Sequence, residues 1–541
     1  MVLELTSKPV LDEGSPGRRL AFGEELNERL LLVCGRFDTE RIFAKGPRQA
    51  HGRDLNISKS RPALGEGVLN KTSPQIAASD SSSRLGRKEM RVYLVNPHNP
   101  VVSLNKVHWN RLNKYRVWKP LGLLVVAGLT PPDWEVTLID ENLDHPDYGR
   151  LPRPDLVGVT AFTSQAPRAY EVAALYRAAG VPVVMGGIHA TFCRQEALEH
   201  VDAVVTGEAE SVWGQVLADT HDHALRRVYE GGISATAIPP ARHDLLRGRY
   251  YLGSLQTTRG CPLNCSFCSV TAFNGGTYRH RPVDDVIREL RLIQEKVILF
   301  VDDNLIGTRQ DHLAYSKDLF REMIQQGLTR PWICQATMNF ADDDELLELA
   351  ARAGCRGVFI GFESPTAEGL MALGKKFNLQ KGRDFRDSVR RIQRHGICVV
   401  GSFIIGIDTD QRGIGETIAR AAKEYGVDAA NLLILTPLPG TKLYAQMERE
   451  GRIRSNHYPQ DWQYYTLTYP VASYTHLSWA ELVEEVNQFN GRFYSYAQIL
   501  RRMLHLASKT HSPRTLSVVL VANLSYRFNH FLDRRVYASR F

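Results

Sequence analysis

Short apolar runs alternate with amphipathic stretches through most of the chain after residue 90. Between residues 91 and about 220, the runs have the length and the continuous hydrophobicity of buried parallel strands. Helical stretches such as Ala166–Ala179 lie between most of them. Five strands in this order predict a flavodoxin-like doubly wound sheet, which binds ligands outside the carboxyl ends of its strands. The predicted strands are Val92–Val95, Val136–Ile139, Leu156–Thr160, Val181–Met185 and Ala203–Val205.

The same alternation returns between residues 250 and about 440. Helices fill the gaps between the apolar runs, and Asp342–Ala353 begins on an aspartate that is followed by further acidic residues. That arrangement is typical of a helix N-terminus. The pattern predicts a partial or complete βα barrel, whose reactive face is formed by the C-terminal ends of its strands. The predicted strands are Tyr251–Thr257, Val297–Val301, Trp332–Gln335, Gly357–Gly361, Val399–Ile405 and Leu432–Leu435.

The two ends of the chain lack this rhythm. Residues 1–89 show no sustained periodicity, and Pro74–Arg87 is rich in serine and in helix breakers. We expect residues 1–89 to be disordered or an over-extended reading frame, with Met90 close to the functional start. Residues 446–541 contain no strand pattern, and Ser478-Trp479-Ala480-Glu481 is a capping box. Leu482, Val486, Phe489 and Phe493 follow at helical spacing, which predicts a helical C-terminal cap over the barrel mouth.

The pattern therefore divides the chain into four parts. Residues 1–89 form the aperiodic N-terminus, residues 90–225 the doubly wound sheet, residues 245–445 the barrel and residues 446–541 the helical C-terminal domain. Composition supports an ordinary globular protein, because 43% of the residues are hydrophobic and 23% are charged. No apolar run reaches the roughly 18 residues that span a bilayer. The start, Met1-Val2-Leu3-Glu4, lacks the basic and apolar regions of an export signal, which favours a cytoplasmic protein.

The net charge of +8 is modest for a chain of 541 residues, so nucleic acid is not an expected partner. The basic bias is strongest near the end of the chain. A solvated helix face is the simplest interpretation, and peripheral contact of the C-terminal region with an anionic membrane is the alternative. The residues concerned are Arg501, Arg502, Arg527, Arg534, Arg535 and Arg540.

Three cysteines carry the strongest chemical signal in the chain. Cys261, Cys265 and Cys268 have the spacing C-x3-C-x2-C, which puts three thiolates on one tight loop. Three thiolates suit three irons of a cuboidal iron–sulfur cluster and leave the fourth iron open to a chelating ligand. A zinc site would need a fourth ligand at similar spacing, and the nearest histidine is His280. Disulfides are disfavoured, because the chain has only eight cysteines and no secretory signal.

Polar segments follow five of the predicted barrel strands. Each is weak evidence alone, since strand ends are usually solvated, but five in order after the cysteine motif form a specific pattern. The segments are Asp302-Asp303-Asn304, Gln335-Ala336-Thr337, Gly361-Phe362-Glu363-Ser364, Gly401–Asp408 and Thr436–Thr441.

Together these motifs resemble the radical S-adenosylmethionine (SAM) superfamily. The resemblance implies that Cys261, Cys265 and Cys268 hold a 4Fe-4S cluster whose open iron binds SAM. Phe267, just before the last cysteine, is typical of the superfamily. The resemblance places Asp303 and Asn304 near the methionyl amino group of SAM, and Gln335 and Glu363 near its carboxylate and ribose. It places Gly406 and Pro437 beside the adenine. The usual GGE after the second strand is replaced here by Asp302-Asp303-Asn304.

The first sheet resembles the cobalamin-binding domain that precedes many radical SAM barrels. The motifs are Gly158–Ser164, Met185–Thr191 and Thr206–Glu210. They imply that Thr163, Ser164, Gly186 and Gly187 make room for the nucleotide tail of cobalamin, with His98, His189 and Glu208 as further contacts. The D-x-H-x-x-G loop of the mutases is replaced by Asn96–Pro100, so we expect cobalamin without a histidine ligand to cobalt. A lone His98 beside prolines is more often structural, and a degenerate sheet retained for packing is the alternative for the whole domain.

The resemblance covers residues 90–445 and is to the cobalamin-dependent (B12-binding) radical SAM family. It implies a C-methyltransferase that acts on an unactivated carbon through a 5′-deoxyadenosyl radical, with no catalytic residue beyond the cluster. The alternatives are a B12-dependent radical SAM cyclase or oxidoreductase without methyl transfer, and a non-catalytic cobalamin or redox sensor. Expected partners are a small-molecule or lipid substrate and an electron donor such as flavodoxin or ferredoxin. Tyr464, Tyr465, Tyr469, Phe493 and Tyr494 suggest an apolar or ring-bearing substrate, although packing explains them equally well.

Overall fold

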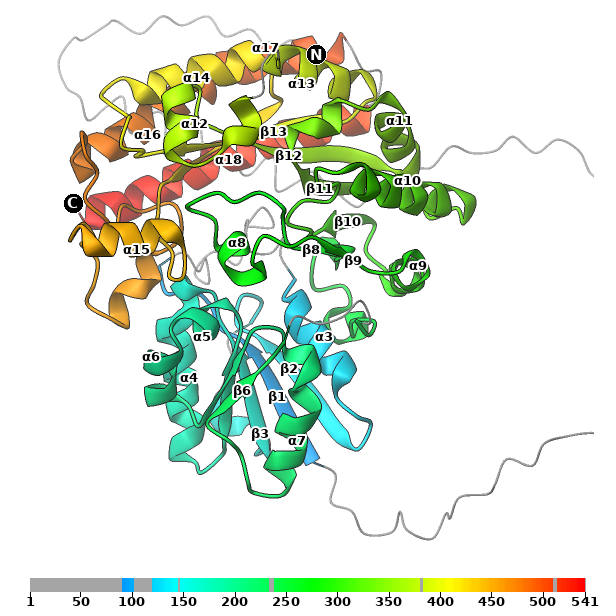
Figure 1. The fold of residues 1–541 in the computed structure, drawn as a ribbon, viewed down its shortest axis with the longest axis vertical. Helices are drawn as coiled ribbons and strands as arrows, with labels where there is room; N and C mark the ends of the chain where they lie inside the picture. The colour runs from blue at the N-terminus through cyan, green and yellow to red at the C-terminus, as the bar shows by residue number, and fades with distance from the viewer. Residues whose placement is uncertain are drawn as a thin grey trace, which may run out of the picture. The chain divides into compact units, whose positions relative to one another are not determined.

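The computed structural model describes residues 90–101, 119–144, 146–232, 238–379, 383–508 and 513–540. The expectation for residues 1–89 lies outside the described residues. The described part is α/β, with two parallel sheets followed by helices (Figure 1). The predicted fold class is therefore confirmed.

The first sheet has the strand order β2-β1-β3-β4-β5-β6, and every pair in it is parallel. This is the flavodoxin-like order 2-1-3-4-5 with one strand added at the edge. The added strand β6 has only three residues, one of them buried, which is too short for a periodicity signal. The strands are β1 (Met90–Asn96), β2 (Trp134–Asp140), β3 (Leu156–Thr160), β4 (Val183–Gly186), β5 (Ala203–Thr206) and β6 (Val228–Glu230).

Helices cover both faces of the first sheet, because alternate residues of each strand are apolar on opposite sides. Tyr93 and Val95 of β1 pack against α4 (Ala166–Ala178), α5 (Ile188–Phe192) and α6 (Arg194–His200). Val92 and Leu94 pack against α3 (Leu121–Leu129) and α7 (Trp213–His221) on the other face. Burial on both faces explains why these strands are continuous apolar runs rather than alternating ones.

The second sheet has six parallel strands in the order β14-β13-β12-β11-β10-β7, so each strand pairs with its neighbour in the chain. Its two end strands do not pair with each other, which makes it a partial barrel. The strands are β7 (Leu252–Leu255), β10 (Val297–Phe300), β11 (Trp332–Ala336), β12 (Cys355–Glu363), β13 (Cys398–Ile405) and β14 (Ala429–Ile434). Each overlaps the strand predicted at that place.

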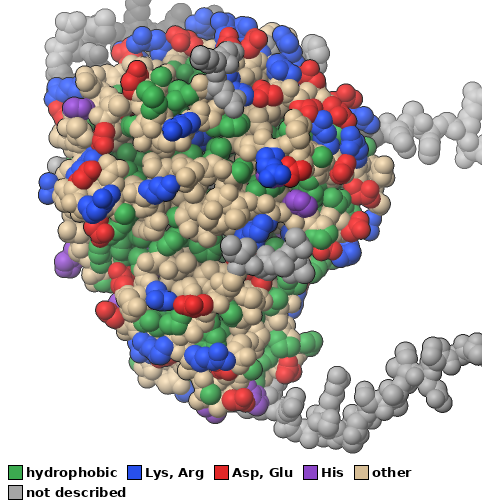
Figure 2. Space-filling view, in the orientation of Figure 1, with side chains coloured by type: hydrophobic (Ala, Val, Ile, Leu, Met, Phe, Trp, Pro, Cys, Tyr) green, Lys and Arg blue, Asp and Glu red, His purple; other side chains and the backbone are tan. Residues whose placement is uncertain are grey.

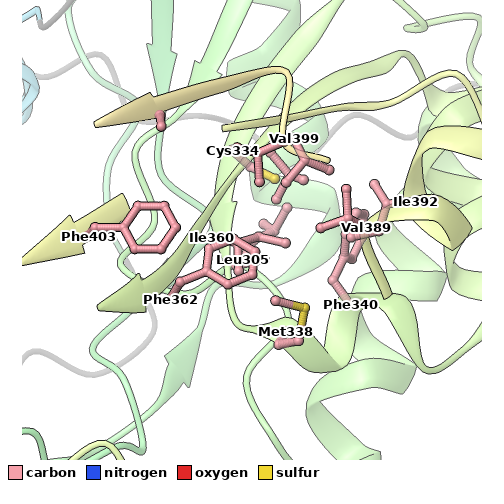
Figure 3. Packing of buried hydrophobic residues seen from close by; sticks show 14 of the residues in the cluster. Leu305, Cys334, Met338, Phe340, Ile360, Phe362, Val389, Ile392, Val399 and Phe403 are labelled. Carbon is pink, nitrogen blue, oxygen red and sulfur yellow. The ribbon is translucent and has the colours of Figure 1, made fainter. Parts of the chain in front are cut away.

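The outer helices of the barrel bury one apolar stripe each against the sheet. Figure 3 shows Val389 and Ile392 of α13 (Phe385–Arg394) beside Phe340, with Ile360 and Phe362 of β12 farther to the side in the same cluster. Asp343 accepts a hydrogen bond from Leu346 N and caps α11, which confirms the predicted helix start to within one residue. The outer helices are α9 (Val283–Leu292), α10 (Gln310–Gln325), α11 (Asp344–Ala353), α12 (Ala367–Ala372), α13 (Phe385–Arg394), α14 (Ile414–Tyr425) and α15 (Lys442–Arg449).

The C-terminal helices are α16 (Trp479–Phe493), α17 (Tyr496–Ala507) and α18 (Pro513–Arg540). The predicted capping box at Ser478 and Glu481 is confirmed, and so is the buried stripe that follows it. Asn523 of α18 donates to Asp428 O beside the edge strand β14. Tyr494 forms hydrogen bonds with the unpaired edge of β14. Its hydroxyl accepts from Ala430 N at 2.9 Å and donates to Ala430 O. These contacts cover an open sheet edge.

Within the described residues, no helix combines the length and the hydrophobicity needed to cross a bilayer. On the face shown in Figure 2, acidic and basic side chains are interspersed with apolar ones.

Candidate active site

The three cysteines lie in a loop, residues 260–278, that we call the cluster loop. Two short antiparallel strands close its neck, β8 (Thr258–Arg259) and β9 (Arg279–His280). Gly260 starts the loop with φ +85°, and a Cβ there would lie 2.3 Å from Thr277 O. Only glycine fits such a position without moving the backbone.

The cysteines are all free thiols, with Cys265 buried and Cys261 and Cys268 half-buried. Burial raises the pKa of Cys265 to about 11, and the nearby ammonium of Lys375 opposes that rise. The pKa of Cys261 is raised in the same way, and Cys268 adds to the rise. The three side chains thus share one electrostatic environment. No three His, Cys, Asp or Glu side chains in the described ranges are grouped so as to hold a single metal ion.

Three acidic and amide side chains after β10 reach the neck of the cluster loop. Asp302 is fully buried and its Oδ1 accepts from Thr257 N, Thr257 Oγ1 and Thr258 Oγ1 at 2.8–2.9 Å. Asp303 Oδ2 accepts from Gly260 N at 3.0 Å. Asn304 Nδ2 lies 3.8 Å from Cys261 Sγ, within reach of a weak N–H···S hydrogen bond. The predicted residues Asp303 and Asn304 therefore both contact the segment that carries the first cysteine.

A buried ion pair at the end of β12 joins a predicted residue to one that the sequence did not reveal. Glu363 Oε1 lies 2.8 Å from Lys375 Nζ, and both side chains are only 9% exposed. Glu363 has φ +65°, a left-handed conformation that is uncommon for a residue with a side chain. Burial acts to lower the pKa of Lys375, but Glu363, Cys265 and Cys261 together raise it above its usual value. Lys375 follows α12, away from any strand end, and its neighbour Lys376 is exposed, so no sequence pattern distinguishes the two.

Three of the remaining predicted SAM residues lie at or just after strand ends of the same sheet, and Phe267 lies in the cluster loop. Gln335 is half-buried, and its carbonyl accepts from Leu305 N at 3.0 Å. Gly406 has φ +93°, and a Cβ there would lie 2.8 Å from the ring of Tyr474. Pro437 is buried two residues after Leu435, and Phe267 is half-buried at the margin of the barrel core. The backbone at Gly406 thus requires glycine, although the close neighbour in this structure is Tyr474.

The residues predicted for cobalamin lie at the carboxyl edge of the first sheet. Thr163 is buried after β3, and the carbonyl of Ser164 accepts from Asn99 Nδ2 at 2.7 Å. Gly186 ends β4, and Gly187 follows with φ +90°. A Cβ on Gly187 would lie 2.7 Å from Thr160 Oγ1 and 3.2 Å from Ala161 O, so the end of β3 leaves no room for a side chain there. The end of β3 fills the space beside Gly187, so glycine is required there for the two strand ends to pack, and the role of the pair toward cobalamin remains a prediction.

His98 follows β1 and is anchored by a carboxylate. Its Nδ1 lies 2.9 Å from Glu141 Oε2, and Arg168 Nη2 donates to Glu141 Oε1 at 2.7 Å. Burial acts to raise the pKa of Glu141, but the bonds from His98 and Arg168 lower it to about 2. Because Glu141 stays ionised, it fixes the orientation of the imidazole.

His189 and Glu208 also have protein partners. His189 is fully buried, and its Nε2 lies 2.9 Å from the Tyr170 hydroxyl and 3.3 Å from Glu196 Oε1. Glu208, after β5, forms ion pairs with Arg259 and Arg279 of the cluster-loop neck. The ligand roles of both residues remain predictions, and in this structure both contribute contacts between elements.

The aromatic residues proposed for a substrate pocket lie in the packed interior. Tyr465, Tyr469, Phe493 and Tyr494 are at most 3% exposed, and Tyr464 is half-buried. Tyr465 donates to Ser455 O and Phe493 stacks on Phe489. Packing therefore accounts for these side chains.

The fold and the site define a cobalamin-type sheet followed by a radical SAM barrel. A family model described as the Radical SAM superfamily matches residues 255–422, and one described as a B12 binding domain matches residues 111–217. The chain belongs to the cobalamin-dependent radical SAM family. It is accordingly an enzyme, and its cofactors are a 4Fe-4S cluster, SAM and cobalamin. Free cysteines beside a buried ammonium fit the cluster, and the residues predicted for cobalamin lie at the carboxyl edge of the first sheet, where such sheets bind ligands.

Several characterised proteins are similar over most of their length. The chain is 29% identical to bacteriochlorophyllide d C-12(1)-methyltransferase of Chlorobaculum tepidum, over 71% of this chain and 84% of that protein. It is 30% identical to hopanoid C-2 methylase of Rhodopseudomonas palustris, over 62% and 65% respectively. The radical SAM methyltransferase TsrM of Kitasatospora setae, solved with tryptophan and a SAM analogue, shares the fold. Its TM-score is 0.58 at 17% identity, covering 83% of this chain and 99% of that one.

Proposed function

We propose that this protein is a C-methyltransferase that acts on an unactivated carbon of an apolar, ring-bearing molecule. The observation that carries the proposal is the cluster loop, which bears three free thiols, two of them beside a buried lysine, on a barrel that follows a cobalamin-type sheet. When bound, the cofactors supply one-electron reduction, hydrogen abstraction and the transferred methyl group.

The chain's own residues hold and position these groups. We assign Cys261, Cys265 and Cys268 as the ligands of the cluster. We assign Lys375 as the cation that balances the negative charge of the thiolates. Asp303 and Asn304 keep the start of the cluster loop against the end of β10. Glu363 keeps Lys375 in place inside the barrel. Positioning and exclusion of water are the protein's share of radical chemistry.

The proposed substrate class rests on the relatives. Those named for bacteriochlorophyllide and hopanoid methylation act, by their names, on tetrapyrroles and on polycyclic lipids. Both classes are large, apolar and ring-bearing. We propose a substrate of this kind, and an electron donor such as flavodoxin or ferredoxin that reaches the cluster from the side of the half-exposed Cys261 and Cys268.

The direct test is anaerobic reconstitution with iron, sulfide and cobalamin, followed by incubation with SAM that carries a labelled methyl group. Extracts rich in tetrapyrroles or polycyclic lipids provide the substrates. We expect a brown protein with a reducible cluster, release of 5′-deoxyadenosine, and label in one apolar product. Protein without cluster absorbance, or without SAM cleavage under dithionite, would contradict the proposal.

A second candidate is a radical cyclase without methyl transfer. The chain is 24% identical to anaerobic magnesium-protoporphyrin IX monomethyl ester cyclase of Rubrivivax gelatinosus, over 63% of this chain and 66% of that protein. The labelled-methyl experiment separates the two candidates. A cyclase would release 5′-deoxyadenosine and convert its substrate without incorporating label.

We further propose that the α17–α18 hairpin rests on an anionic membrane surface. Residues 486–541 contain nine Lys and Arg residues and one Asp, which equals the entire net charge of +8. Arg492, Arg501 and Arg502 lie close enough to Lys423 to add to the effect of burial and lower its pKa. Four aliphatic side chains of the hairpin are exposed, Leu500 by 60%, Leu504 by 63%, Val518 by 43% and Leu520 by 39%. Cationic and aliphatic groups together suit an anionic bilayer.

Co-sedimentation with vesicles tests this contact. We expect binding to phosphatidylglycerol vesicles, weak binding to phosphatidylcholine vesicles, and a decrease at high salt because the charges are screened. Leu500→Gln/Leu504→Gln is expected to reduce binding. The matched control is Leu175→Gln/Leu292→Gln, which changes two similarly exposed leucines elsewhere on the molecule. Equal binding by both double variants, or binding to single-stranded RNA instead of vesicles, would overturn the proposal.

A further inference from the structure

Four charged side chains connect the loop after β5 to the neck of the cluster loop. Arg279 Nη2 and Nη1 bind the two carboxylate oxygens of Glu208 at 2.5 and 3.2 Å. Arg259 Nη1 lies 3.2 Å from Glu208 Oε2, and its Nη2 lies 2.5 Å from Glu210 Oε1. We call these four residues the arginine latch. Two guanidinium groups and two carboxylates make it neutral overall.

Loss of one member of the latch would be costly in free energy, because like charges would then face each other without compensation. Arg259 and Arg279 are directly opposite each other in the β8–β9 ribbon, and like charges in that position destabilise a strand pair. Glu208 lies against both and removes the repulsion. The four side chains are only 7–21% exposed, so water and salt screen them weakly. Bidentate, charge-assisted bonds of this kind are directional as well as strong.

Both ends of the latch are attached to rigid backbone. Arg259 lies two residues before Cys261, at the point where the ribbon closes the cluster loop. On the other side, Gly207 precedes Glu208 with φ +68°, and a Cβ on Gly231 would lie 2.0 Å from Glu208 O. The backbone of Glu208 is therefore held tightly by the loop after β6. A movement of the carboxyl edge of the first sheet would pull directly on the cysteine segment.

We propose that the arginine latch fixes the position of the cluster loop relative to the carboxyl edge of the first sheet. Its four members are positioning residues. The inference rests on the proposed function only because it takes the cluster loop to hold the cluster and the carboxyl edge of the first sheet to hold cobalamin. The latch gives Glu208 a role different from the cobalamin contact that the sequence suggested. Its loss leaves each cofactor bound and allows the distance between them to vary.

The first test uses the full-length protein as purified, without added cofactors. Hydrogen exchange is followed in peptides covering residues 260–278, in wild type and in Arg259→Gln/Arg279→Gln. We expect faster exchange there in the variant. The matched control is Arg383→Gln, which removes a bidentate arginine–aspartate pair with Asp342, an exposed residue just before α11. Glu208→Gln/Glu210→Gln is a second variant, which keeps the shape of the latch but leaves the two arginines opposed. Unchanged exchange in both latch variants would overturn the proposal.

The second test uses the reconstituted protein. Pulsed dipolar spectroscopy measures the distance between the reduced cluster and cob(II)alamin, which are both paramagnetic. We expect one narrow distance in wild type and in Arg383→Gln, and a broadened distribution in Arg259→Gln/Arg279→Gln at equal iron and cobalamin content. Equal content with an unchanged distribution would refute the latch alone. Protein that takes up neither cofactor would instead refute the proposed function, and the hydrogen-exchange result would still decide the latch.

Discussion

At the scale of single residues, the environment of the cluster loop is set by a few buried charges. Lys375 is the ammonium that opposes the rise in pKa of Cys265 and Cys261. A thiol must lose its proton to bind iron, so a nearby cation favours cluster assembly. Glu363 compensates the same lysine from the other side. The pair would be expensive to break, because either partner alone would be an uncompensated buried charge.

The cysteine assignment predicts a selective loss of metal. Cys265→Ala is expected to reduce bound iron strongly and to abolish the signal of the reduced cluster, because one iron loses its only protein ligand. Iron and sulfide content and electron paramagnetic resonance provide the measurement. Cys193→Ala, a half-buried cysteine of the first sheet's helical layer, is the control and should retain both. Full iron content in Cys265→Ala would show that the three thiols do not hold the cluster.

Asp302 predicts a pH dependence of stability. Burial raises its pKa from 3.8 to about 6, although four bonds from Thr257 and Thr258 oppose the rise. Between those pH values the folded protein keeps the proton and the unfolded chain releases it. The contribution of Asp302 to the free energy of unfolding therefore falls as pH rises from about 4 to about 6, by on the order of 2–3 kcal/mol.

Urea unfolding of the cofactor-free protein at several pH values measures this effect. As pH rises through that window, the free energy of unfolding of wild type should fall relative to that of Asp302→Asn. Asp344→Asn serves for comparison, because Arg391 lowers the pKa of Asp344 and the sign of its contribution is opposite. A difference between wild type and Asp302→Asn that is independent of pH would contradict the assignment.

At the scale of elements, strand ends and the loops after them decide where ligands can approach. The turn at Gly187 brings the backbone within contact of Thr160 on the neighbouring strand. The same device occurs at Gly260 in the cluster loop, where the close neighbour is Thr277 O. In both places a positive φ and the absence of a side chain let two backbone segments meet.

Gly187→Ala is therefore expected to destabilise the protein by about 1–3 kcal/mol and to weaken cobalamin uptake, because strain and a 2.7 Å contact would displace the loop after β4. Chemical denaturation and the absorbance of bound cobalamin report the two effects. Gly214→Ala in α7 is the matched control, since a Cβ there meets nothing within 4 Å. We expect that control to leave stability unchanged or to raise it by less than about 1 kcal/mol. Equal stability of the two variants would contradict the role given to Gly187.

At the scale of the whole molecule, residues 90–541 form one compact unit by their contacts. The two sheets each have their own core, and the arginine latch joins them near the cysteine motif. We propose that this unit is the functional enzyme and that its boundary lies at Met90.

A chain beginning at Met90 should accordingly fold and bind cofactors like the full chain. Thermal unfolding, iron content and cobalamin content of the two chains provide the comparison. A chain beginning at residue 98, which lacks β1, is the control. It should not fold, because β1 is an inner strand between β2 and β3. A lower unfolding temperature or lower cofactor content in the chain that begins at Met90 would assign a structural role to residues 1–89.

Much of the architecture was predictable because it depends on local pattern. Strands buried on both faces are continuous apolar runs, so β1, β3 and the barrel strands were recognisable one by one. The capping box at Ser478 and the stripe after it are local as well. The three cysteines could be proposed as cluster ligands because their spacing along the chain is itself the chemical signal. The short strand β6 carries too few residues for such a signal.

Contacts between residues far apart in the chain could not be predicted from local pattern. Lys375 and Lys376 are alike in sequence, and one is buried beside Glu363 while the other is exposed, because chain packing determines which side chain faces inward. The pairing of Glu208 with Arg259 and Arg279 joins residues about 50 and 70 positions apart. Short-range spacing along the chain specifies most of the elements and carries the prediction for the three cysteines. The charges that surround the site depend on which elements meet in space, and no local pattern specifies that.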